Sequence, residues 1–144
     1  MKPFKDYLSD RQKVKKQGPD FAEADSLMKQ ASARLADVLT LPLTEKNASF
    51  RFEAAYESVR EALQAFMALD GFKPYSHEAI VAYALETKIC NEREAMALDR
   101  YREMRNDINY RGQNVTLEDA KAIILFAKEI LSKLKKRFNQ KGNH

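Results

Sequence analysis

Residues 52–71 read FEAAYESVREALQAFMALDG, and this stretch is the one that most strongly predicts the fold. Their apolar side chains recur at steps of three and four residues, which is the period of an amphipathic α-helix. These side chains are Phe52, Tyr56, Val59, Leu63, Phe66 and Met67. Gly71 supplies a stop, because glycine readily takes the left-handed conformation that ends a helix. The stretch therefore predicts a long, aromatic-rich helix at the centre of the core.

Four further segments show helical spacing of apolar residues, each with its own boundary signals. N-cap residues mark three of the starts: Asp20, Ser76 and Thr116. Leu41-Pro42 ends the first helix, since the residue before a proline resists the helical conformation. The fourth helix is expected from about Glu92 to Tyr110. Because connections are short and strand signals unconvincing, the sequence predicts an all-α fold, a five-helix up-and-down bundle.

The 144 residues suffice for one domain with its own core. We expect a basic N-terminal arm over residues 1–18, a single helical domain over residues 19–138 and a polar tail over residues 139–144. The arm carries a net charge of +4, and residues 133–144 carry +5. Such basic ends could contact RNA or an acidic partner, or they could be solvated segments that keep the protein soluble.

Several classes of protein do not fit this composition. No apolar run is long enough to span a bilayer, and residues 1–6 lack the apolar stretch of a signal peptide. The single Cys90 cannot form an internal disulfide, and two histidines are too few for an ordinary zinc site. We therefore expect a cytoplasmic protein with no metal, no other cofactor and no membrane contact. His77 is expected to make a local structural hydrogen bond, and Cys90 to pack as an inert thiol.

Residues 105–112, RNDINYRG, form the most polar part of any predicted helix. Arg105 lies at the border of the apolar stripe, where it could face a phosphate or pair with a carboxylate such as Asp107 from another chain, or Glu103. Asn109 shares the face of Arg105 and could line the same groove. Tyr110 lies roughly 140° around an ideal helix from Arg105. The two converge only if the helix end unwinds or a second subunit contributes.

Two stretches, taken in order, resemble the HEPN family of small helical domains associated with RNA and nucleotides. Residues 54–63, AAYESVREAL, continue through the Gly71 stop to Ser76-His77, which is similar to the family's long second helix and its connection. Arg105-Asn106 resembles the family's Arg-x4-His signature on the fourth helix, in which Asn often follows the Arg. Here Tyr110 stands at the position of the His. The resemblance covers about residues 20–138.

The resemblance implies metal-independent RNA cleavage, commonly by the toxin of a toxin–antitoxin pair or within a defence system, at a site built across a homodimer. The implied catalytic residues are Arg105, Asn106 and Tyr110. Their neighbours Arg102, Asn109 and Arg111 are candidates for binding phosphate or RNA. Arg105 would stabilise the charge that gathers on phosphorus, and Asn106 would orient a neighbouring group or a phosphate oxygen.

Tyr110 leaves the activity open. A phenol with a pKa near ~10 is a poor general base at physiological pH, although it could still donate a hydrogen bond to phosphate. The alternative is a catalytically inactive helical module for dimerisation or partner binding. In some members of the family a tyrosine beside the motif is nucleotidylylated by a partner nucleotidyltransferase. That resemblance makes Tyr110 a candidate acceptor, and an antitoxin or nucleotidyltransferase a candidate partner.

Overall fold

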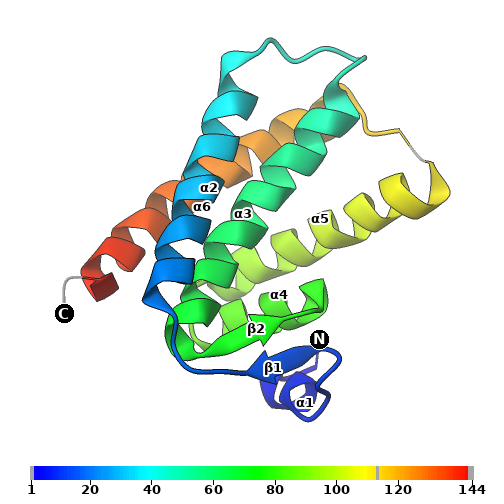
Figure 1. Ribbon diagram of the computed structural model, residues 1–144. Coiled ribbons are helices and arrows are strands. Elements are labelled where there is room, and N and C mark those ends of the chain that lie inside the picture. The colour runs from blue at the N-terminus through cyan, green and yellow to red at the C-terminus, as the bar shows by residue number, and fades with distance from the viewer. Residues whose placement is uncertain (1, 113, 143–144) are drawn as a thin grey trace.

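The computed structural model describes residues 2–112 and 114–142, with the backbone alone at positions 111 and 142. These residues form six helices and two short strands. In chain order the elements are α1 (Phe4–Leu8), β1 (Val14–Lys16), α2 (Phe21–Thr40), α3 (Ala48–Asp70), β2 (Phe72–Pro74), α4 (His77–Glu86), α5 (Glu92–Arg111) and α6 (Leu117–Gly142). The protein is therefore mostly helical, as predicted (Figure 1).

The predicted caps of the main helices are confirmed by individual hydrogen bonds. The Asp20 carboxylate accepts a hydrogen bond from a backbone N–H in the first turn of α2 at 2.9 Å, and the Thr116 hydroxyl does the same for α6 at 3.1 Å. Ser76 caps α4 in this way. Gly71 ends α3 with φ +85°, and a Cβ there would lie 2.6 Å from the Gln17 carbonyl oxygen. Glycine is therefore required at that position.

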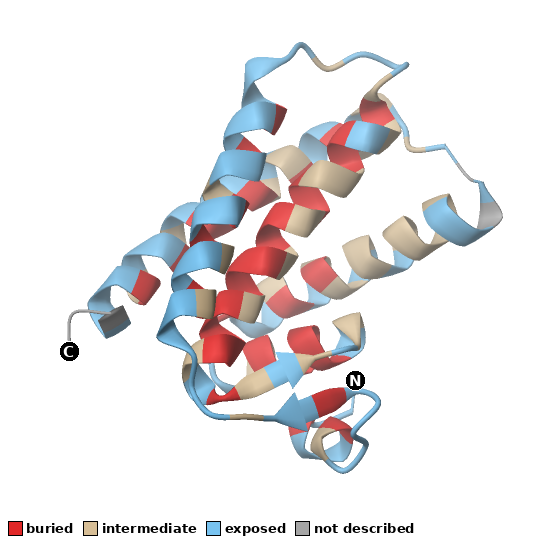
Figure 2. Ribbon diagram, viewed as in Figure 1, coloured by how far each residue is buried: buried red, intermediate tan, exposed pale blue. Residues whose placement is uncertain are grey.

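The long helix α3 lies at the centre of the molecule. α2 and α6 pack against it, while α4 and α5 pair with each other on another side (Figure 1). Buried residues run along α3 and along the inward faces of its neighbours (Figure 2). The expected core aromatics Phe52, Tyr56, Phe66 and Tyr83 are each at most 2% exposed. Among the helices of the described residues, none combines the length and apolarity needed to cross a membrane.

The segment expected to be a basic arm folds back onto the helices. Phe4 and Tyr7 of α1 are buried, and the Phe4 ring packs edge-on against Phe72 and Tyr83, with centroid separations of 5.2 and 5.4 Å. β1 pairs antiparallel with β2, placing Val14 opposite Pro74. The expectation that the chain has no strand is therefore wrong. Each strand has only three residues, too few for an alternating pattern, and forms because its partner is brought close by the fold.

Candidate anion-binding site

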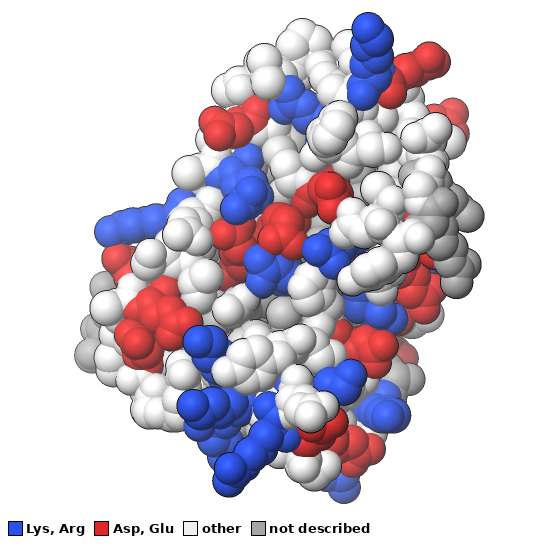
Figure 3. All heavy atoms as spheres, turned by 45° about the vertical axis from the view of Figure 1, so that its right-hand side comes forward, with Lys and Arg blue, Asp and Glu red and all other residues white. Residues whose placement is uncertain are grey.

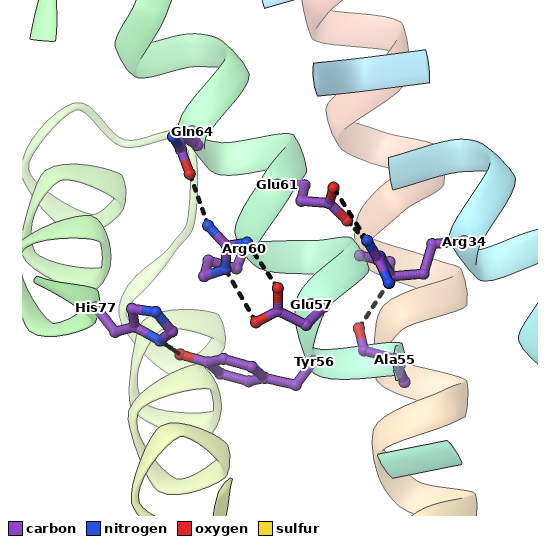
Figure 4. Close-up of polar contacts among 9 residues, drawn as sticks. Arg34, Ala55, Tyr56, Glu57, Arg60, Glu61, Gln64 and His77 are labelled. Atoms are coloured by element: carbon purple, nitrogen blue, oxygen red, sulfur yellow. Dashed lines mark hydrogen bonds and ion pairs between the residues drawn. The ribbon is translucent and has the colours of Figure 1, made fainter. Parts of the chain in front are cut away.

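A cluster of polar side chains lies where α3, α4 and α5 meet. Tyr56, Glu57 and Arg60 come from α3, His77 from the start of α4, and Arg105 from α5. Tyr56 and Arg60 are four residues apart and so share one face of α3. We call these five residues the polar cluster. Figure 4 shows how its α3 and α4 members lie.

The centre of the polar cluster is a hydrogen bond between two rings. The Tyr56 hydroxyl lies 3.0 Å from Nδ1 of His77, and the rings stack with an interplanar angle of 21°. Burial raises the pKa of Tyr56 above its ordinary value, so the phenol is neutral. His77 is the only hydrogen-bond partner of this phenol within the described residues. Because this buried hydroxyl has no other acceptor among the described residues, we assign it as the donor to Nδ1, which places the proton of the neutral imidazole on Nε2.

His77 shows that the site has a positive potential. Burial, followed by repulsion from Arg60 and Arg105, lowers the pKa of His77 to about 4, against a smaller opposing effect of Glu57. The imidazole is therefore neutral at physiological pH. The expectation of a local structural hydrogen bond is wrong, because the partner Tyr56 is 21 residues away on another helix.

Arg60 is neutralised by its own helix. Its guanidinium binds both carboxylate oxygens of Glu57, at 2.6 and 3.0 Å, and also donates to Gln64 at 2.6 Å. Burial alone would raise the pKa of Glu57, but the hydrogen bonds and charge of Arg60 outweigh it and hold that pKa below its ordinary value. This fork-to-fork pair leaves little of the Arg60 charge for a ligand.

Arg102, expected to bind phosphate, is also occupied by carboxylates. Its guanidinium lies 2.9 Å from Asp99, 3.6 Å from Glu78 and 3.7 Å from Glu103. Glu78 in turn accepts a hydrogen bond from Tyr7 at 3.1 Å, which ties α1 to α4 and α5. Arg102 therefore joins α5 to α4, and through Glu78 to α1, so a structural role explains its contacts.

Arg105 differs from both of these arginines. Its Cζ atom lies 5.9 Å from the centroid of the Tyr56 ring, within the range of a cation–π contact. Its Nε is buried without a hydrogen-bond partner, and its guanidinium makes no ion pair within the part of the chain that the structure describes. Glu103, a carboxylate considered for it, contacts Arg102 instead. Leaving a buried donor unsatisfied costs about 1–3 kcal/mol, so Arg105 is held ready for an acceptor that the described chain does not supply.

The other residues named by the signature lie further along α5. Asn106 is half-buried, whereas Asn109 is exposed and Tyr110 is 81% exposed. The helix continues to Arg111 without unwinding, so a single chain does not bring Tyr110 to Arg105. The Arg111 side chain lies outside the described parts of the structure.

Sequence reasoning found Arg105 but missed the residues around it. Tyr56 was expected as a core residue, which it is, and His77 as a structural histidine. The spacing of Tyr56 and Arg60 offered a signal, since an aromatic and an arginine one turn apart share a face. Nothing in the sequence placed that face beside His77 and Arg105. Comparisons with family models, with curated proteins and with solved structures found no match for this chain.

Proposed function

We propose that this protein binds the phosphate groups of RNA or of nucleotides at the polar cluster, as an HEPN-like helical-bundle domain. The observation that carries the proposal is Arg105, whose guanidinium is held over Tyr56 and lacks an anionic partner in the described chain. A guanidinium of this kind binds phosphate oxygens through strong, charge-assisted hydrogen bonds. The resemblance of Arg105-Asn106 to the family signature supports the same assignment.

Binding without cleavage is what the arrangement favours. RNA cleavage by the family mechanism needs a group that takes a proton from the 2′-hydroxyl. Tyr110 lies on the exposed end of α5. His77 carries its proton on Nε2 and has Nδ1 engaged by Tyr56, so it is a donor rather than a base. These features support binding of RNA or nucleotides without cleavage. A place in a toxin–antitoxin or defence system is proposed from the resemblance to the HEPN family alone.

Basic side chains beyond the polar cluster could extend the contact with RNA. Figure 3 shows Lys and Arg side chains gathered towards the α1–β1 end of the molecule, whereas the middle of the same face carries both signs. Arg11, Lys15 and Lys16 line a hollow of about 840 Å³ at that end. Sequence-independent contacts of this kind contribute to affinity and to its dependence on salt.

We propose that the protein forms a homodimer in which the two α5 helices approach each other. That arrangement would bring the exposed Tyr110 of one copy towards Arg105 of the other. It corresponds to the expectation from the sequence that a second subunit could bring these two side chains together. Light scattering at micromolar concentration tests it, and a monomer would refute the composite site. An antitoxin or nucleotidyltransferase partner remains a prediction, and mass spectrometry of the co-expressed pair would detect a nucleotide on Tyr110.

RNA binding is tested with a fluorescent single-stranded RNA and fluorescence anisotropy. Arg105→Ala removes charge-assisted hydrogen bonds worth about 1.5–3 kcal/mol, so we expect the Kd to rise by about 10- to 100-fold. The control is Arg100→Ala, which removes the same charge from an exposed site on the same helix and is expected to change the Kd by less than about threefold. Equal effects of the two substitutions, or no binding of RNA by the natural protein, would refute the proposal.

A further inference from the structure

We propose that His77 is the second ligand of the bound phosphate and takes up a proton from solvent when the phosphate binds. The inference rests on the proposed function, because it concerns the same site, and it adds a regulatory property that the family signature does not contain. The site would then bind RNA more tightly as pH falls.

The hydrogen bond with Tyr56 determines which nitrogen of His77 can meet a ligand. Nδ1 accepts from the Tyr56 hydroxyl at 3.0 Å and is therefore occupied. Nε2 carries the proton and lies on the opposite side of the ring, so it donates to an acceptor that approaches from outside. His77 is half-buried, so part of the residue is accessible to solvent. A phosphate oxygen is an acceptor that suits both this N–H and the guanidinium of Arg105.

The charges facing His77 come from both neighbouring helices. α3 contributes Arg60 and Glu57, which neutralise each other through two hydrogen bonds. α5 contributes two arginines. Arg102 is paired with Asp99 and with Glu78 of α4. Arg105 has no carboxylate partner among the described residues, and its Nε has no hydrogen-bond acceptor there. Arg105 is therefore the cation beside the imidazole that no carboxylate of the described residues pairs with, and Arg60 adds to the repulsion despite its pair with Glu57.

A phosphate bound to Arg105 reverses this balance. In the free site, burial and the charges of Arg60 and Arg105 oppose a proton on the imidazole. A phosphodiester brings a negative charge, which cancels the repulsion from Arg105 and attracts an imidazolium. One proton from solvent then binds Nδ1, and the Nδ1–H donates to the Tyr56 oxygen. The phenol O–H, which loses Nδ1 as its acceptor, then turns towards the bound phosphate. Nε2–H continues to donate to the phosphate, now as a charged donor.

Proton uptake makes the affinity depend on pH. The free imidazole has a pKa of about 4. Each unit by which the ligand raises that pKa adds up to about tenfold in affinity at pH values below both pKa values. If the bound value lies about two units higher, RNA binds about tenfold more tightly at pH 5 than at pH 7. Above the bound value the affinity is independent of pH.

The chain offers a direct measurement, because His77 and His144 are its only histidines. His144→Gln leaves a single imidazole, whose pKa is measured by NMR titration with and without an oligouridylate. Uridine phosphodiesters do not change charge in the range of the titration, so any pH dependence comes from the protein. We expect the ligand to raise the pKa of His77 by about one to two units.

Two variants complete the test by anisotropy at pH 5 and pH 7. His77→Gln keeps an N–H donor but cannot be protonated, so its affinities for RNA at pH 5 and at pH 7 should agree within about threefold. Arg100→Ala should keep the dependence on pH. RNA binding with an unchanged His77 pKa would refute the role of His77 and leave the proposed function intact. If the oligouridylate does not bind at any pH, the proposed function itself fails.

Discussion

Replacing Arg105 by methionine should make the protein more stable while raising the Kd for RNA by about 10- to 100-fold. Methionine keeps an unbranched apolar stem against the Tyr56 ring and removes the guanidinium. The buried Nε without a partner costs about 1–3 kcal/mol, which the substitution recovers. The lost cation–π contact is worth about 0.5–1 kcal/mol at a partly exposed site. The expected net gain is about 1 kcal/mol in the free energy of unfolding, or about 3 °C in Tm.

Urea denaturation followed by circular dichroism measures this change, and Arg102→Met is its matched control. Both arginines lie on α5, one turn apart, but Arg102 is paired with Asp99 and Glu78. Its loss leaves partly exposed carboxylates without a cation and should lower the stability by about 1–2 kcal/mol. Anisotropy on the same samples should show that Arg105→Met loses affinity for RNA although it remains folded. If Arg105→Met is destabilised as much as Arg102→Met, Arg105 is structural and the reasoning fails.

Three further outcomes are expected. Folding lowers the pKa of His77 from about 6.5 in the unfolded chain to about 4. The free energy of unfolding should therefore be highest above pH ~6.5 and decrease as pH falls towards 4. In urea titrations, His77→Gln should flatten this dependence of stability on pH. Arg34→Met removes the guanidinium that lies 2.6 Å from the Glu61 carboxylate, whose side chain is 4% exposed. Chemical denaturation should show that the free energy of unfolding falls by about 2 kcal/mol, and an unchanged midpoint would contradict the buried pair. Tyr110→His should restore the family signature, and cleavage of a fluorogenic RNA by this variant but not by the natural protein would support a catalytically silent natural site.

The helices could be predicted because their signals are local. The caps Asp20, Ser76 and Thr116 and the stop at Gly71 act within a few residues of their own positions, and each is found where the sequence placed it. The fold of the N-terminal residues could not be predicted in the same way. Val14 is buried only because β1 pairs with β2, which lies nearly sixty residues further along the chain. Such a contact leaves no periodicity in either segment.

The candidate site was predictable only where it coincides with a signature. Arg105 stood out through its polar surroundings on an amphipathic helix. Tyr56 did not, because a buried tyrosine at core spacing has the same pattern whether its hydroxyl meets a ligand-binding histidine or water. His77 carries even less local information, since a histidine beside a helix cap usually has a structural role. Its contact with Tyr56 depends on how α4 crosses α3.

The contrast between Arg102 and Arg105 shows what distinguishes a structural arginine from a ligand-binding one in this fold. The two residues are one turn apart on α5, and spacing alone treats them alike. Arg102 meets Asp99 of its own helix and Glu78 from the first turn of α4, so its charge is neutralised. Arg105 meets the aromatic ring of Tyr56 on α3, which does not remove its charge, and this charge helps to keep His77 neutral. The assignment of function therefore depends on where the neighbouring helices place their carboxylates, which the sequence of α5 does not encode.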